Sequence, residues 1–220
     1  MISETKPSPA SNAAVSKARS KLRRDFQQWR AFQLASYPQL HDHITLVDSS
    51  TTEIQSLKLP SSFTLGQRAT LGLDDLAAIE YDLREGQAYD ALHEVREAIK
   101  TFNYNLAFKK TNIHGQRANT RAQSFLRSLA GDKVSAADKY RRARTALLSL
   151  GLREDDKVFQ PLYDNQLWMK NVNEPQQLGE KAVVEPWIWI VGGPKGMSKE
   201  EEADWSLDSK LDLDFNTWTQ

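Results

Sequence analysis

The clearest alternation of hydrophobic and polar positions runs from residue 73 to residue 108. Over its second half the apolar residues recur at intervals of three, four, three and four: Leu92, Val95, Ile99, Phe102 and Leu106. This heptad-like spacing predicts one long helix with a single face buried against a partner helix. An earlier stripe has similar spacing but is two residues out of register: Leu76, Ile79 and Leu83. Gly86 lies in the break, where we expect a kink or a change of packing partner.

A second helical pattern covers 118–151. Its first part is predicted to be a helix capped by Asn119 or Thr120,. Three apolar residues of this helix are expected to face the core: Ala122, Phe125 and Leu129. Gly131 then occupies a C-terminal cap position, and residues 135–138 have the S-x-x-D form of a capping box, which predicts a broken return limb. In the second part the apolar positions recur at intervals of three, four and three: Tyr140, Ala143, Leu147 and Leu150. Gly151 is expected to end it.

The flanking sequence predicts less regular structure. A basic helix ending at Pro38 would bury one apolar stripe: Leu22, Phe26, Trp29, Phe32 and Leu34,. One helical turn is expected near Gln67–Leu71, and the apolar run around Trp187–Val191 is expected to dock as an extended segment. The chain thus divides into a disordered tail (1–10), a basic amphipathic helix (11–40), a linker (41–72), a helical hairpin (73–151), an irregular segment packing on the hairpin (152–195) and an acidic tail (196–220). The predicted fold is all-α, a long antiparallel, coiled-coil-like hairpin with these additions.

Charge is distributed in blocks, although 29 bases and 29 acids give a formal net charge of zero over the 220 residues. The net charge is +4 over 1–47, −6 over 74–99, +9 over 100–145 and −5 over 196–220. A sign asymmetry of this kind points to an interaction surface within the basic block. The zero total therefore does not exclude an anionic partner for one part of the chain.

Nine bases of this block are the candidate nucleic-acid-binding residues: Lys109, Lys110, Arg117, Arg121, Arg127, Lys139, Arg141, Arg142 and Arg144. Such a cluster neutralises phosphates and gives an affinity that depends on salt. The alternative is a solvated polar face that forms ion pairs with the acidic block at 74–99.

Other chemistry finds little support. The absence of Cys excludes zinc fingers, iron–sulfur sites and Cys nucleophiles,. His41 and His43 lack further ligands nearby, Asp74 and Asp75 suit the first turn of a helix, and the glycines of 192–196 do not have the order of a phosphate-binding loop,. We expect no cofactor, metal or small-molecule substrate. No apolar run reaches the roughly 20 residues of a membrane span, so no membrane role is expected and an intracellular location is the default.

Four stretches carry a family resemblance. Residues 112–151 read NIHGQRANTRAQSFLRSLAGDKVSAADKYRRARTALLSLG, Glu80–Glu97 read EYDLREGQAYDALHEVRE, Arg23–Pro38 read RRDFQQWRAFQLASYP, and Trp187–Val191 read WIWIV. Taken in their order along the chain, they resemble the C-terminal helical region of fungal Kyakuja–Dileera–Zisupton (KDZ) transposases. The resemblance covers about residues 20–191.

The resemblance implies a limited role. KDZ transposases resemble enzymes with an RNase H-like core that holds two divalent metals. That core lies N-terminal to the region seen here, and this chain shows no alternation of strands and helices that would build it. The Cys-rich cluster often attached to the family is also missing. We therefore expect no catalytic activity but a transposase-derived module, accessory to DNA contact or transposase assembly. Its partners would be DNA, bound weakly and without sequence preference, a second copy or a transposase core, and its location nuclear. The alternative is a protein–protein interaction scaffold with no nucleic-acid role.

Overall fold

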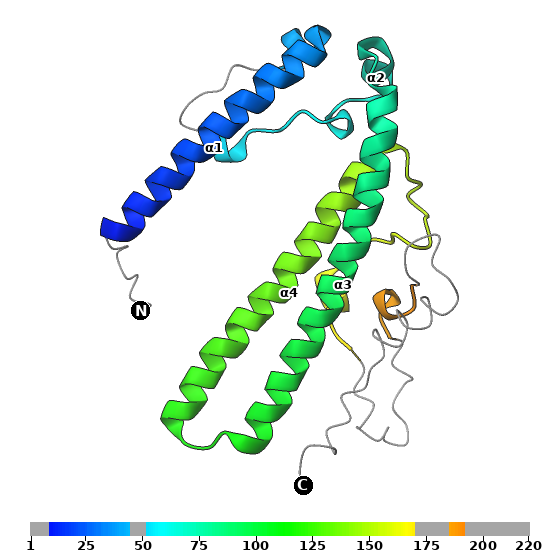
Figure 1. Ribbon diagram of the computed structural model, residues 1–220. Coiled ribbons are helices and arrows are strands. Elements are labelled where there is room, and N and C mark those ends of the chain that lie inside the picture. Colours follow the sequence, from blue (N-terminus) through cyan, green and yellow to red (C-terminus); the bar gives the residue numbers. More distant parts are fainter. Residues whose placement is uncertain (1–8, 45–51, 170–184, 192–220) are drawn as a thin grey trace. The chain divides into compact units, whose positions relative to one another are not determined.

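The computed structural model describes residues 9–44, 52–169 and 185–191 (Figure 1). Every regular element within these ranges is helical, so the protein is all-α, as the sequence predicts. The chain divides into two compact units, Met1–Asp75 and Leu76–Gln220, which are described separately below. Most of the predicted N-terminal tail and all of the predicted acidic tail lie outside the described residues.

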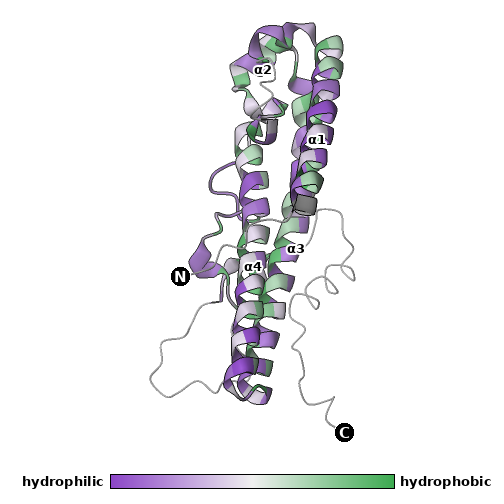
Figure 2. Ribbon diagram, turned by 90° about the vertical axis from the view of Figure 1, so that its left-hand side faces the viewer, coloured by the Kyte–Doolittle hydropathy of each residue, from purple (hydrophilic) through white to green (hydrophobic). Residues whose placement is uncertain are grey.

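The second unit is built on an antiparallel pair of long helices, α3 (Asp74–Asn112) and α4 (Gln116–Leu150). They lie side by side in two perpendicular views, and hydrophilic positions are frequent near the turn that joins them (Figures 1 and 2). Gly115 forms this turn with φ of 86°, a left-handed conformation that glycine adopts without steric strain,. The predicted hairpin is therefore present.

The core of this unit lies in the half of the hairpin away from the turn. Both helices contribute small and large apolar side chains that are buried together: Ala88, Leu92, Val95, Ile99, Ala137, Tyr140, Ala143 and Leu147. Alanines at the contact allow the helix axes to approach closely, and the seven-residue steps from Tyr140 to Leu147 and from Leu92 to Ile99 keep each seam facing its partner. Toward the turn, Leu126 is the buried apolar side chain of α4, so that half of the hairpin is more open to solvent.

Gly131 does not break the return limb, and this prediction is wrong. α4 continues through it without interruption, and the predicted caps at 119–120 and 135–138 lie inside the helix. An exposed glycine within a helix costs only about 1 kcal/mol relative to alanine, which packing on either side offsets. Gly151 does end the helix, with φ of 116°, so the prediction for that residue is confirmed.

Two predicted inward faces point to solvent instead. Ile79 and Leu83 of α3 are exposed, whereas Glu80 between them is buried and accepts a hydrogen bond from Arg84. On α4, Phe125 is 53% exposed because the buried position is its neighbour Leu126. Leu126 thus takes the inward position predicted for Phe125, whereas the predicted inward residues Ala122 and Leu129 are half-buried.

An irregular segment completes the core of the hairpin. Phe159, Leu162 and Leu167 pack against α3 and α4, and Tyr140 donates a hydrogen bond from its hydroxyl to the carbonyl of Gln160 at 2.7 Å. Burial of this phenol raises its pKa above the ordinary value, because the charged form is disfavoured away from water,.

A short 3₁₀ turn, η5 (Trp187–Trp189), docks on the same core and buries Ile188 and Trp189. The prediction of an extended segment here is wrong, although the docking itself is present. Arg96 of α3 holds the turn: its Nε donates to the carbonyl of Ile188 at 2.8 Å and its Nη2 to that of Val191 at 2.9 Å. A carbonyl at the end of a 3₁₀ turn has no partner within the turn, so a side-chain donor can satisfy it.

The first unit contains one long helix and several short ones: α1 (Pro9–Ser36), η1 (Pro38–His43), η2 (Thr52–Ile54), η3 (Pro60–Ser62) and α2 (Leu65–Leu71). α2 begins with a capping box between Thr64 and Gln67 and agrees with the helical turn predicted there,. Of the predicted apolar stripe of α1, Phe26 is buried but Leu22 and Phe32 are exposed, because polar side chains take the inner positions nearby.

Those polar side chains, Arg30 and Gln33, bind the backbone of the segment opposite. Arg30 donates to the carbonyl of Ser56 and to the Gln33 side chain at 2.8 Å, and Gln33 Nε2 donates to the carbonyl of Lys58 at 2.8 Å. Lys58 has φ of 53°, which is uncommon for a residue with a side chain,. The hydrogen bond from α1 thus helps hold Lys58 in a left-handed conformation.

Replacement of Lys58 by glycine is therefore expected to stabilise the first unit by up to about 1 kcal/mol, because the left-handed conformation costs a residue with a Cβ about that much. Thermal unfolding of the full chain, followed by circular dichroism, measures the change. Lys58→Ala, which removes the same charge but keeps the Cβ, should leave the melting temperature unchanged. An alanine variant that melts above the glycine variant would contradict this explanation.

Candidate nucleic-acid interface

The hairpin distributes the nine candidate bases between its two ends. Five lie within about four turns of the loop that joins α3 to α4, a region called here the hairpin tip: Lys109, Lys110, Arg117, Arg121 and Arg127. The other four lie on the last three turns of α4, beside the irregular segment: Lys139, Arg141, Arg142 and Arg144. These two groups have different surroundings.

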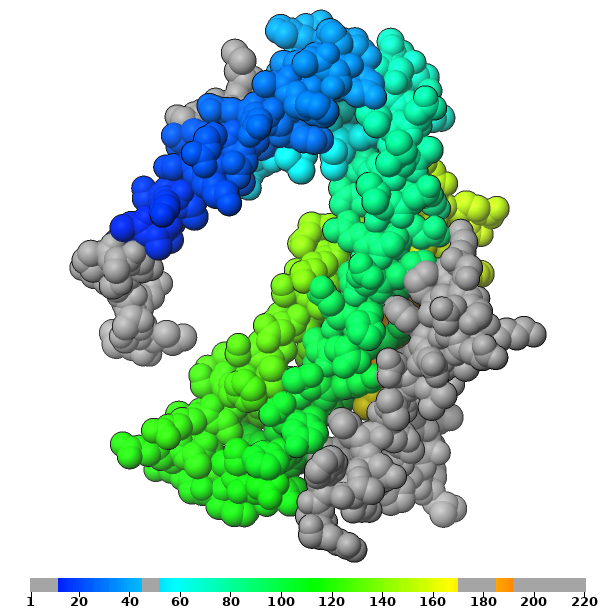
Figure 3. Space-filling view, viewed as in Figure 1, coloured from blue at the N-terminus to red at the C-terminus, as the bar shows by residue number. Residues whose placement is uncertain are grey.

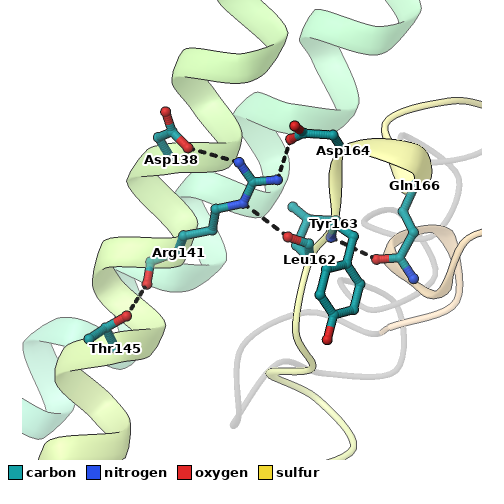
Figure 4. A network of polar contacts seen from close by, with 7 residues as sticks. All are labelled: Asp138, Arg141, Thr145, Leu162, Tyr163, Asp164 and Gln166. Atoms are coloured by element: carbon teal, nitrogen blue, oxygen red, sulfur yellow. Dashed lines mark hydrogen bonds and ion pairs between the residues drawn. The ribbon is translucent and has the colours of Figure 1, made fainter.

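Arg141 belongs to a network that fastens the irregular segment to α4 (Figure 4). Its Nε donates to the carbonyl of Leu162 at 2.9 Å, its Nη1 to Asp138 at 2.8 Å and its Nη2 to Asp164 at 2.6 Å. The hydrogen bond to Asp164, with Asp138 on its other side, raises the pKa of the guanidinium above its usual value. All three groups are internal partners, so this guanidinium is already engaged within the folded unit.

Two further bases of the group are also engaged within the unit. Arg144 donates from Nε to the carbonyl of Phe159 at 2.8 Å, and Lys139 forms an ion pair with Glu94 of α3 at 2.6 Å. The second contact matches the alternative prediction, in which the basic block pairs with the acidic one. Arg142 is exposed and lies at the rim of a shallow hollow with Asp138 and Thr145.

The bases of the hairpin tip are in contrast mostly open to solvent. Four of them are exposed and form no hydrogen bond or ion pair with any other described residue: Lys110, Arg117, Arg121 and Arg127. Lys109 is half-buried, and its Nζ donates to Gln123 across the hairpin at 2.6 Å. The space-filling view shows part of this end of the hairpin, in green, open on the face turned to the viewer (Figure 3).

No acid interrupts this region. Between Glu97 and Asp132 the sequence contains six bases and no Asp or Glu: Lys100, Lys109, Lys110, Arg117, Arg121 and Arg127. Each arm of this acid-free region is about 15 residues of helix, or about 22 Å at about 1.5 Å per residue. That length corresponds to about six base pairs at about 3.4 Å each, so several phosphates fit along it.

The helix ends at the tip have opposing effects on its charge. The first turn of α4 has neither an acid nor a side-chain cap, so its backbone N–H groups add positive potential,. The last turn of α3 has the opposite polarity, and Lys109 and Lys110 partly serve to offset it,. The exposed arginines in the first half of α4, Arg117, Arg121 and Arg127, therefore contribute the clearest excess of positive charge.

Sequence reasoning missed two features that bear on the site. The first is a pair of basic residues with unusual surroundings: Arg96 is buried and only 2% exposed, and the half-buried Lys133 places its Nζ 4.0 Å from the ring centroid of Phe102. Burial lowers the pKa of both groups,. The other feature is a set of exposed aromatic side chains at the tip: Tyr104, Phe108 and Phe125. Their mixture with bases was visible in the sequence, but their orientation was not.

Within the described ranges, no three His, Cys, Asp or Glu side chains come together as metal ligands would. None of the helices in that part of the chain is both long and apolar enough to cross a membrane. Compared with family models, curated proteins and solved structures, the chain shows no match.

Proposed function

We propose that this protein is a non-catalytic, transposase-derived helical module that contacts DNA phosphates through its hairpin tip. The observation that carries the proposal is a set of four exposed bases that form no hydrogen bond or ion pair with other described residues and lie within an acid-free region of the sequence. The KDZ resemblance of residues 112–151 falls on the same region and supplies the transposase origin and the nuclear location as parts of the proposal.

The free charges also set the strength of binding. Four phosphate contacts imply a slope of about −3.6 in a plot of log affinity against log salt, at about −0.9 per contact. The acidic block at 74–99 repels the same polyanion, and the net charge of the chain is zero. We therefore expect weak, sequence-independent binding, with a dissociation constant in the range of about 10⁻⁴ to 10⁻⁶ M that is usual for non-specific complexes.

Titration of a fluorescently labelled DNA duplex with the full chain, between about 50 and 200 mM salt, tests this proposal. The expected result is saturable binding at the low end, a slope between about −3 and −4, and equal affinity for two unrelated sequences. Absence of binding at about 50 mM salt would contradict it, and so would a slope near zero.

The second candidate function is a protein–protein interaction scaffold. The exposure of Ile79 and Leu83 on α3 favours it, since neighbouring exposed apolar side chains on a helix suit a helical partner, including a second copy,. Concentration-dependent sedimentation without DNA binding would favour this function over the first. A monomer that binds DNA would favour the first.

A further inference from the structure

The aromatic side chains of the tip share one face of the hairpin. The ion pair between Glu94 and Lys139 joins α3 to α4 at 2.6 Å. These two residues therefore lie at the same height along the two helices and on the same face of the hairpin. Phe108 lies 14 residues after Glu94, and Phe125 lies 14 residues before Lys139. Fourteen residues are two heptads, which return nearly to the same face of a helix. Phe108 and Phe125 therefore lie at one level of the hairpin and on one face of it.

Neighbouring positions on this face complete a mixed surface, called here the aromatic face of the tip. Tyr104 precedes Phe108 by one helical turn, and Arg121 and Arg117 precede Phe125 by one and two turns,. The three aromatic side chains are 41%, 46% and 53% exposed, in the order Tyr104, Phe108 and Phe125. The aromatic face thus combines partly exposed rings with two exposed guanidinium groups that have no partner among the described residues.

We propose that the aromatic face of the tip binds single-stranded nucleic acid, with unpaired bases stacked on Phe108 and Phe125 and the phosphates held by Arg117 and Arg121. Exposed rings beside basic side chains are the combination that binds unpaired strands without sequence preference, because every base has an aromatic face. A duplex hides these base faces in its own stack and presents only phosphates to the arginines. The inference rests on the proposed function and specifies its substrate.

Charge favours this occupant over a protein. Single solvent-exposed apolar residues are common on protein surfaces, and the surfaces that bind proteins typically have a larger contiguous apolar patch with a polar rim. Here the charged residues of the rim are all basic, since the nearest acids along the two arms are Glu97 and Asp132. A ligand that carries both negative charge and flat aromatic rings is complementary to this surface. An unpaired nucleic acid strand has both, because its phosphates are anionic and its bases are exposed.

The test compares oligonucleotides of about 12 nucleotides on the full chain. One arm uses single-stranded DNA, a second uses RNA of the same sequence and a third uses the DNA duplex. All carry 2-aminopurine, whose fluorescence is quenched when it stacks on an aromatic ring. We expect tighter binding of both single strands than of the duplex, with quenching in the single-stranded complexes. Tighter binding of one of the two single strands would show whether DNA or RNA is the preferred ligand of the aromatic face.

The variant carrying Phe108→Leu and Phe125→Leu keeps two exposed apolar side chains but removes the rings. It should lose about tenfold in affinity for the single strands together with the quenching, while its salt slope and its affinity for duplex stay unchanged. Phe32→Leu, at an exposed position of α1, is the matched control and should behave as the unaltered chain.

The outcomes separate this inference from the proposed function. Duplex binding with the expected salt slope, but with no preference for single strands, would overturn the inference and leave the function standing. Loss of duplex affinity in the Phe108 and Phe125 variant would overturn the inference as well, because it would indicate a general apolar contact. Absence of binding to every oligonucleotide would contradict both.

Discussion

Replacement of Arg96 by methionine is expected to lower the free energy of unfolding of the second unit by about 2–4 kcal/mol. The change leaves the buried carbonyl of Ile188 and the partly buried carbonyl of Val191 without this donor, and an unsatisfied buried acceptor costs about 1–3 kcal/mol,. Part of the loss is offset because a buried charge is removed. Burial lowers the pKa of Arg96 to about 10 from 12.5, which means that the folded state holds the charged form less favourably than the unfolded chain does,.

Urea unfolding followed by tryptophan emission measures this effect, because Trp187 and Trp189 flank the carbonyl that Arg96 binds. Arg127→Met is the control: it makes the same chemical change at an exposed position of the same hairpin and should alter stability by less than about 0.5 kcal/mol,. If Arg96→Met unfolds at the same urea concentration as the unaltered chain, Arg96 does not hold the turn.

The hairpin was predictable from the sequence because its strongest signal is local. Alternating three- and four-residue spacings specify a buried seam, and Gly151 at the end of the second limb specifies a stop. The break at Gly131 was predicted wrongly because a single glycine carries only about 1 kcal/mol. Burial of Leu126 and Ala136 on either side of Gly131 stabilises the helix by more than the glycine costs. That stabilisation depends on a partner helix that local sequence does not reveal.

The exposure of Ile79 and Phe125 has a similar origin. The spacing of each from other apolar residues predicts an inward position, but spacing alone defines a helical face only to within one position. The burial of Glu80 and Leu126 determines which face of each helix points inward, and that burial depends on contacts within the folded protein. An apolar residue on the wrong side of the seam is then left to solvent.

The candidate site could be predicted only as a set of residues. Arg141 and Arg144 look like the other bases of 100–145, yet the folded chain places them against carbonyls and carboxylates of a segment 10 to 23 residues further along. No helical spacing connects those partners, because the segment that carries them is irregular. The tip arginines have no such segment beside them among the described residues, and this difference separates structural bases from candidate binding bases.

The variant Arg117→Gln, Arg121→Gln and Arg127→Gln is expected to lose most of its affinity for duplex DNA. Each phosphate contact contributes about one to the salt slope, so the slope should fall from about −3.6 to about −1. At about 50 mM salt the same relation predicts roughly a tenfold loss of affinity for each contact removed. Stability should change little, because all three side chains are exposed and form no hydrogen bond or ion pair with other described residues,.

A matched variant makes the comparison direct. Lys17→Gln, Lys21→Gln and Arg24→Gln removes the same three positive charges from exposed positions of α1, which is also a basic helix. Both variants have the same net charge, so a general attraction between the chain and a polyanion would weaken equally in the two. We expect the duplex salt slope of the α1 variant to match that of the unaltered chain and the slope of the tip variant to lie about three units closer to zero. Equal slopes in the two variants, or a larger change in the α1 variant, would contradict a DNA contact at the hairpin tip.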